Sequence, residues 1–151
     1  MRPSQLKTLE KKLGYTFKNK SLLQTALTHK TYAFEAMEPI EYNERLEFLG
    51  DSILNFIIAD KLYTTNAYFA EGELTRRRAF IVNNKWLAEQ GKKLGIGKYL
   101  RVGKGEEQQG GKDNPTNIAN AFESLIGAIY LDSDLNKVKD IIFTHIVADK
   151  L

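Results

Sequence analysis

Hydrophobic residues recur at helical spacing along almost the whole chain, and this pattern predicts an all-α fold. In the first segment Leu6, Leu9 and Leu13 share one face, with Ser4 as the predicted N-cap and Gly14 as the stop signal. One further helix is predicted to start at Asn19 or Ser21, another to run from about Glu41 to Thr65, and a third to start near Glu71. The remaining predicted helices cover Trp86 to Leu94 and Thr116 to Leu131, and the last one follows Asp134. The sequence contains no convincing strand. Since the segment 41–65 includes the strongly apolar residues 53–59, we expect it to be the central and most buried helix.

Glycine-rich residues 103–111 separate two of these helices, and they predict a flexible loop. The tetrapeptide Gly110-Gly111-Lys112-Asp113 at the end of this loop lacks the Ser or Thr and the spacing of a phosphate-binding P-loop. We therefore expect no nucleotide cofactor.

Three carboxylates stand at helical spacing inside the longest predicted helix. Glu44, Glu47 and Asp51 occupy positions i, i+3 and i+7, so they share one face. Like charges roughly 6 Å apart repel by about 3 kcal/mol at an effective dielectric of about 20, which calls for a compensating charge. Oxygen ligands without His or Cys favour Mg²⁺ or Mn²⁺ over Zn²⁺. The spacing predicts a divalent-metal site, and a solvated acidic face is the simpler alternative.

A second acidic helix is predicted after Pro115. Between residues 117 and 128 Glu123 is the only ionisable group, and Asn120 lies one turn before it on the same face. A lone buried carboxylate needs hydrogen bonds, a metal, or a cation such as Arg45. Gly50 and Gly127 mark the two acidic segments as places of close helix packing, because a glycine inside a helix costs about 1 kcal/mol relative to alanine.

One domain covering residues 1–151 fits a chain of 151 residues with 42% hydrophobic content. The absence of cysteine excludes disulfides and thiolate metal sites. No apolar stretch approaches the roughly 18 residues of a membrane span, and the N-terminal residues lack the features of a signal peptide. We expect a cytoplasmic protein without a membrane partner.

The formal net charge of +3 permits a polyanionic partner without requiring one. Positive residues concentrate in the middle third of the chain, at Arg76, Arg77, Arg78, Lys92, Lys93, Lys98, Arg101 and Lys104. Basic flanks around an acidic metal pocket would suit an enzyme that acts on phosphodiesters, with Arg76 to Arg78 as candidate substrate contacts. An ordinary exposed helix face is the alternative for these arginines.

The segment Glu44-Arg45-Leu46-Glu47-Phe48-Leu49-Gly50-Asp51-Ser52 resembles the defining motif of the ribonuclease III nuclease domain. The resemblance extends over nearly the whole chain, with matches at Leu27-Thr28-His29-Lys30-Thr31, Glu71-Gly72-Glu73-Leu74-Thr75 and Ala121-Phe122-Glu123-Ser124-Leu125-Ile126-Gly127-Ala128.

This resemblance implies an all-helical homodimer that cuts both strands of double-stranded RNA with Mg²⁺. The expected products carry 5′-phosphate and 3′-hydroxyl ends with two-nucleotide 3′ overhangs. By motif position the metal ligands are Glu47, Asp51, Asn120 and Glu123, with Asp51 and Glu123 as catalytic residues, while Glu44 and Glu71 border the cleft and Phe48 enters a socket on the partner subunit.

Two departures from the family pattern stand out. Asn120 occupies a place where the family has an Asp, and its amide oxygen can touch a cation but brings no charge. We therefore expect weaker metal binding or slower turnover. The second departure is that the sequence ends after the last nuclease helix, without the double-stranded-RNA-binding domain usual in bacterial members, so RNA affinity should suffer most.

Two other functions stay open at this stage. A catalytically weak or inactive domain of the same fold could bind structured RNA or a ribosomal partner, as Asn120 permits. A carboxylate-bridged di-iron bundle is poorly supported, because that class uses Glu-x-x-His pairs. Here the residues three before His29 and His145 are Ala26 and Ile142.

Overall fold

The computed structural model describes residues 2–151, apart from the side chain of residue 149, and over this range it is built of helices joined by short connections. The elements in order are α1 (Pro3–Leu13), α2 (Lys20–Ala26), α3 (Lys30–Glu35), α4 (Glu44–Thr65), α5 (Glu71–Val82), α6 (Asn84–Leu94), η1 (Ile96–Tyr99), α7 (Lys104–Gln108), α8 (Pro115–Asp132), α9 (Leu135–Ile142), η2 (Phe143–Val147) and η3 (Ala148–Lys150). The predicted all-α fold is confirmed. None of the helices in residues 2–151 is long and apolar enough to cross a membrane.

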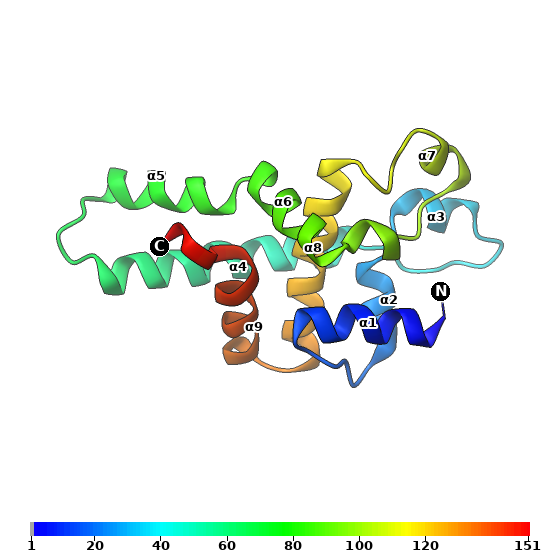
Figure 1. Ribbon diagram of the computed structural model, residues 1–151, viewed down its shortest axis with the longest axis horizontal. Helices are drawn as coiled ribbons and strands as arrows, with labels where there is room; N and C mark the ends of the chain where they lie inside the picture. The colour runs from blue at the N-terminus through cyan, green and yellow to red at the C-terminus, as the bar shows by residue number, and fades with distance from the viewer. Residues whose placement is uncertain (1) are drawn as a thin grey trace.

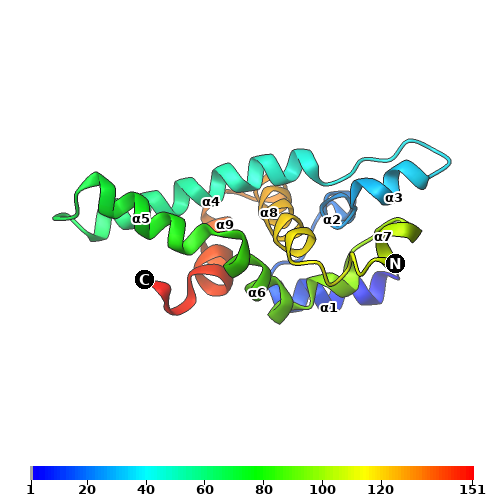
Figure 2. The same ribbon diagram turned by 90° about the horizontal axis from the view of Figure 1, so that it is seen from above.

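Helix α8 runs through the middle of the molecule, with α4 on one side and α6 and α1 on the other (Figure 2). Residues 121–129 of α8 are all buried, whereas α4 buries one face and exposes the other. The prediction that segment 41–65 is the most buried helix is therefore wrong. Helix α8 takes that place because other helices cover it from both sides, while α4 has one side open.

Local capping chemistry sets most helix ends. Gly14 ends α1 in the left-handed conformation, with a φ of 78° that favours glycine. The side chain of Asn19 accepts a hydrogen bond from the amide of Ser21 at 3.0 Å and starts α2, as predicted. Ser4 is not an N-cap, because Pro3 already fits the first helical position and α1 begins there.

Helix α4 starts at Glu44, three residues later than predicted, because buried Asn43 is held by the preceding segment. The amide of Asn43 donates to the carbonyl of Thr28 at 2.9 Å, and its side chain donates to the carbonyl of Ala26 at 3.4 Å. These bonds fix the chain just before the first turn of α4.

Two short helices were not expected from the sequence. Helix α3 is capped by His29, whose Nδ1 accepts a hydrogen bond from the amide of Thr31 at 3.3 Å. Helix α7 lies inside the segment 103–111 that was predicted to be a flexible loop. The carboxylate of Glu35 accepts a hydrogen bond from the amide of Lys104 at 3.0 Å, and Thr31 Oγ1 accepts one from the amide of Gly103 at 2.9 Å. These bonds from α3 order the segment, so the loop prediction is wrong.

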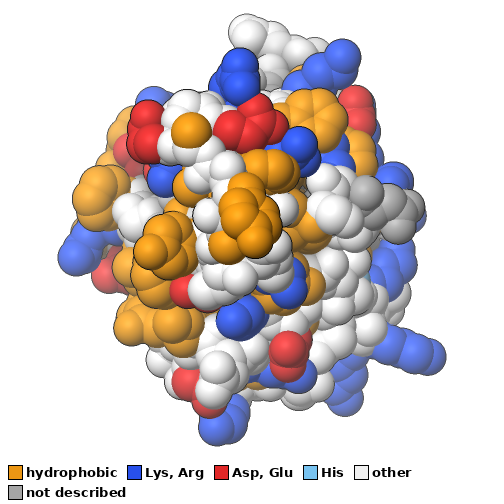
Figure 3. Space-filling model, turned by 90° about the vertical axis from the view of Figure 1, so that its left-hand side faces the viewer, with side chains coloured by type: hydrophobic (Ala, Val, Ile, Leu, Met, Phe, Trp, Pro, Cys, Tyr) orange, Lys and Arg blue, Asp and Glu red, His pale blue; other side chains and the backbone are white. Residues whose placement is uncertain are grey.

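Helices α4 and α5 form a long hairpin that projects from the rest of the molecule (Figure 1). Hydrophobic side chains reach the surface among charged groups at this end of the molecule (Figure 3). The hairpin therefore presents apolar surface to solvent. Packing of α4 into the core does not account for these exposed hydrophobic side chains.

Candidate functional site

The two acidic helices cross at their glycines. A Cβ on Gly50 would stand 1.7 Å from the carbonyl oxygen of Glu123, and a Cβ on Gly127 would stand 2.5 Å from the carbonyl oxygen of Leu46. Both distances are far shorter than van der Waals contact. The backbones of α4 and α8 therefore touch, as the glycines predict. This crossing brings Glu47 and Asp51, which flank Gly50, beside Glu123.

Glu123 is a buried acid at this crossing, with 6% of its surface exposed. Arg45 is exposed, and in the part of the chain that the structure describes no lysine or arginine forms an ion pair with Glu123. Burial, followed by the charges of Asp51 and Glu47, raises the pKa of Glu123 to about 8. The ion pair between Glu123 and Arg45, which the sequence left open as an alternative to a metal, is thus not formed.

The acids of α4 differ in their surroundings. Burial raises the pKa of half-buried Glu47, the charges of Glu44 and Asp51 raise it further, and Lys30 opposes the shift. Asp51 is exposed and accepts a hydrogen bond from the side chain of Asn55 at 3.1 Å. Glu44 is exposed and forms an ion pair with Lys30 at 3.4 Å. The acids of α4 that raise the pKa of Glu123 are therefore Asp51 and Glu47, and within residues 2–151, without the side chain of residue 149, no ion pair offsets them at Glu123.

Asn120 is half-buried one turn before Glu123 on α8. Its backbone carbonyl accepts a hydrogen bond from Ser124 Oγ at 2.8 Å, and the same hydroxyl lies 3.0 Å from the carbonyl of Asn43. Ser124 thus links this turn of α8 to the start of α4, so Asn120 and Glu123 are held on the side of α8 that meets α4.

The acidic side chains at the crossing do not form a ready-made metal site. Within residues 2–151, without the side chain of residue 149, no three His, Cys, Asp or Glu residues are gathered closely enough to hold a metal ion. The chemistry of the donors nevertheless fits Mg²⁺, because all of them are oxygen ligands and one of them is a buried carboxylate without a counter-charge. A cation at this crossing would have to draw Glu47, Asp51 and Glu123 together.

Glu71, a further predicted site residue, lies away from the crossing. Glu71 begins α5 and borders the second half of α4 near Asp60 and Tyr63, about 20 Å along the helix from Glu47. Phe48 lies beside Glu47 on α4 and is 79% exposed. A single chain therefore does not bring Glu71 to the other acids.

The three arginines of α5 are also distant from the crossing. Arg76 and Arg77 both form ion pairs with Glu73 on their own helix, and Arg77 stacks over Phe69 at 4.5 Å. Arg78 and Glu71 both line the wall of a groove. Their role as substrate contacts stays a prediction.

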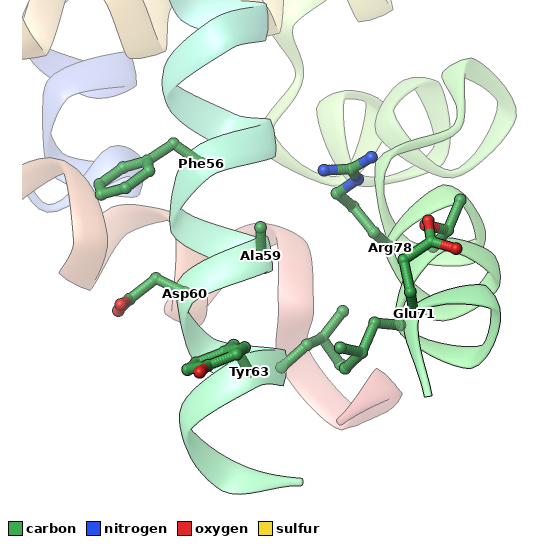
Figure 4. A pocket seen from close by; sticks show the side chains of 9 residues that line it. Phe56, Ala59, Asp60, Tyr63, Glu71 and Arg78 are labelled. Atoms are coloured by element: carbon green, nitrogen blue, oxygen red, sulfur yellow. The ribbon is translucent and has the colours of Figure 1, made fainter. Parts of the chain in front are cut away.

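That groove, between α4 and α5, was not found from the sequence. It has a volume of about 430 Å³ and is lined by Phe56, Ala59, Asp60, Leu62 and Tyr63 of α4 and by Glu71, Leu74, Thr75 and Arg78 of α5 (Figure 4). Phe56 is 57% exposed and Tyr63 is 74% exposed. Phe56 and Tyr63 lie on α4, the helix that also carries Phe48, and neither belongs to the buried face of that helix. This pattern of aromatic residues was the sequence signal that could have indicated the groove.

Residues 19–150 match the family model described as Ribonuclease-III-like. The chain belongs to this family. Among its relatives, Ribonuclease 3 of Vibrio parahaemolyticus is 46% identical over 93% of this chain and 60% of that protein. Ribonuclease 3 of Magnetococcus marinus is 44% identical over 97% of this chain and 63% of that protein. The chain thus spans about three fifths of the length of these relatives.

Solved structures of the ribonuclease III family share the fold. A nuclease domain of ribonuclease III from Campylobacter jejuni superposes with a TM-score of 0.87 and 37% identity, over 97% of this chain and 95% of that one. A second structure of that nuclease domain is reported to show flexibility in the region of dimer formation. It superposes with a TM-score of 0.86 and 38% identity, over 93% of this chain and 94% of that one. These matches confirm the resemblance and the helical nuclease-domain fold.

Proposed function

We propose that this chain is a Mg²⁺-dependent endonuclease, with Mn²⁺ as a substitute, that hydrolyses both strands of double-stranded RNA as a homodimer. The observation that carries the proposal is the crossing of α4 and α8, which brings Glu47 and Asp51 beside the buried, uncompensated Glu123. Membership of the ribonuclease-III-like family supports the same chemistry.

A divalent cation held by Glu47, Asp51, Asn120 and Glu123 would lower the pKa of a bound water and neutralise charge that develops on the scissile phosphate. The chain's own part is to supply these ligands from two helices whose backbones are in contact. Because the pKa of Glu123 is about 8, its carboxyl carries a proton near neutral pH when no cation is present, and it releases that proton on binding one.

Asp51 and Glu123 are the residues that we assign to the reacting phosphate, with Glu47 and Asn120 completing the ligand set. The hydrolysis breaks the bond between phosphorus and the 3′ oxygen, so it leaves a 3′-hydroxyl on one fragment and a 5′-phosphate on the other. Asn120 contributes an oxygen without charge, so we expect a higher Mg²⁺ requirement than an Asp would give.

The dimer is proposed to form through α4 and the groove. Phe48 is exposed near one end of α4, and the apolar groove lies along the other half of the same helix. A two-fold axis crossing α4 between them would place each Phe48 in the groove of the partner subunit. A cavity of about 150 Å³ is enough for benzene, so a groove of about 430 Å³ accepts a phenyl ring.

This arrangement would also give Glu71 a role near the acids. Glu71 lies in the groove wall. When the partner's Phe48 enters that groove, the partner's Glu44 and Glu47 arrive on the adjacent turn of the same helix. Glu71 would then border the acidic site of the other subunit, and the family's two-nucleotide overhangs would follow from the spacing of two such sites.

A binding module without activity is the second candidate, favoured by Asn120 and by the open arrangement of the carboxylates. Incubation of a perfect RNA duplex with Mg²⁺ and the native chain decides between the two, with Glu123→Ala as the control. Cleavage by the native chain alone supports the nuclease. A shifted but intact duplex supports the binding module.

A further inference from the structure

The turn at Gly95 brings lysines of α6 and η1 together with a lysine of α1, which is distant from them in sequence. Gly95 joins α6 to η1 in the left-handed conformation, with a φ of 72°. The amide of Gly95 donates to the carbonyl of Lys92 at 2.9 Å, and its own carbonyl accepts from the amide of Lys98 at 3.1 Å. A Cβ at Gly95 would stand 3.4 Å from Lys12 Nζ and 3.9 Å from Lys98 Cε. The side chains of Lys12 and Lys98 therefore meet at this turn, and exposed Lys92 begins it through its backbone carbonyl. We call these three residues the Gly95 lysine cluster.

The Gly95 lysine cluster is not paired with acids among the described residues. In the portion of the chain described by the structure, Lys12, Lys92 and Lys98 take part in no ion pair. Of the two acids on α1 and α6, Glu10 is buried and paired with Lys20, and Glu89 lies a turn before Lys92. Lys7 and Lys11 extend the positive charge along the exposed side of α1.

The charge of the whole molecule is uneven as a result. The chain has 22 basic and 19 acidic residues, while α1, α6 and η1 together hold seven lysines and only two glutamates. The rest of the chain is therefore slightly acidic. Lysines in the last turn of a helix stabilise its end, which accounts for Lys12 and Lys92 separately but not for their meeting with Lys98 at one turn.

The cluster faces away from the acidic site. Helix α8 lies between α4 and the pair formed by α6 and α1 (Figure 2). Glu47 and Asp51 belong to α4, whereas the cluster belongs to α1, α6 and η1, so α8 separates the helices that carry the two groups of residues. Lys92 and Lys98, which were expected to flank the acidic pocket, thus cannot hold the same phosphates as the acidic site.

We propose that the Gly95 lysine cluster is a second RNA-contact surface, which binds phosphate groups of an RNA segment outside the one at the acidic site. Flexible ammonium groups suit phosphates read without regard to sequence. An anionic membrane is the less suitable partner, because in residues 2–151 none of the large exposed hydrophobic side chains lies on α1, α6 or η1. The proposal rests on the proposed RNA-binding function, but it concerns binding alone and does not depend on cleavage by the chain.

The test compares two triple variants with equal loss of charge. Lys12→Gln, Lys92→Gln and Lys98→Gln remove the cluster, while Lys18→Gln, Lys85→Gln and Lys137→Gln are the matched control. Anisotropy of a labelled RNA duplex longer than one site, without divalent ions, gives the affinity at several salt concentrations. Circular dichroism and thermal unfolding verify that both variants fold.

We expect the cluster variant to bind about tenfold more weakly at low salt, with a salt slope smaller by about 2 to 3, because each phosphate contact contributes about 0.9 to that slope. The control should stay within about twofold of the native chain. Equal affinities and slopes for the two variants would overturn the proposal, as would loss of vesicle binding by the cluster variant with RNA binding unchanged. Failure of cleavage alone would count against the proposed nuclease and leave this result intact.

Discussion

Gly50 and the backbone carbonyl of Glu123 are in direct contact, so that a single added methyl group at Gly50 would stand 1.7 Å from that oxygen. Neither partner is a mobile side chain, and the two helices can relieve the clash only by moving apart. The position of the buried acid relative to α4 therefore depends on the absence of a side chain at this glycine.

Gly50→Ala should destabilise the protein by at least about 3 kcal/mol, because the new methyl group overlaps backbone in the core. Gly72→Ala is the matched control. Gly72 also lies in a helix, α5, but a Cβ there meets nothing within 4 Å. That change should be neutral or stabilising by about 0.5 kcal/mol, because alanine favours helix. Urea unfolding of both variants measures the difference, and equal midpoints would contradict the packing described here.

Stability without divalent ions should fall as pH rises from about 4.5 to 8. Burial raises the pKa of Glu123 to about 8, whereas in the unfolded chain it is close to the ordinary value. Between these values the folded state keeps a proton that the unfolded state has lost, so each pH unit costs at most about 1.4 kcal/mol. Below this window both states are protonated, and above it both are ionised.

The measurement is the urea midpoint at pH 5.5 and pH 7.5 in EDTA, for the native chain and Glu123→Gln. The native chain should lose stability at the higher pH, and the variant should lose less. Addition of Mg²⁺ at pH 7.5 should restore part of the loss in the native chain only. A variant with the same pH dependence as the native chain would show that Glu123 is not its source.

Asn120→Asp should raise the rate of RNA cleavage or lower the Mg²⁺ concentration needed for half-maximal rate, because it adds a charged oxygen ligand. A Mg²⁺ titration with a duplex RNA substrate measures both. The substitution Asn136→Asp controls for added charge, since Asn136 is exposed on α9 and does not belong to either acidic helix. Superimposable titrations of Asn120→Asp and the native chain would exclude a ligand role.

Phe48→Ala should weaken dimerisation by a factor of about 10 to 100, as expected for an aromatic anchor at the centre of an interface. The free energy of unfolding of a single subunit should change little, because Phe48 is 79% exposed. Sedimentation velocity over a concentration series measures the dimer, with Phe34→Ala, an aromatic exposed by 71% on α3, as control. If both variants dimerise equally well, the groove between α4 and α5 does not receive Phe48.

Much of the fold and of the central site was predictable because the signals are local. The spacing of Glu44, Glu47 and Asp51 and the lone Glu123 identify the two acidic helices, and Gly50 and Gly127 indicate that these helices touch. The ribonuclease III resemblance rests on the same residues and is confirmed by the family match.

Other features depend on contacts between distant segments, which periodicity does not encode. Helix α7 forms because Glu35 and Thr31 bind the amides of Lys104 and Gly103. The distance of Glu71 from the acids follows from the length of α4. The meeting of Lys12 with Lys98 at Gly95 likewise requires α1 and η1 to pack together.

The most direct test of the account is the cleavage of a long, perfect RNA duplex by the native chain across a Mg²⁺ titration, beside Glu123→Gln. The account predicts fragments with 5′-phosphate and 3′-hydroxyl ends that appear only with the cation, and a rate at least about 100-fold lower for the variant. Intact duplex at every Mg²⁺ concentration, or equal cleavage by the native chain and the variant, would contradict it.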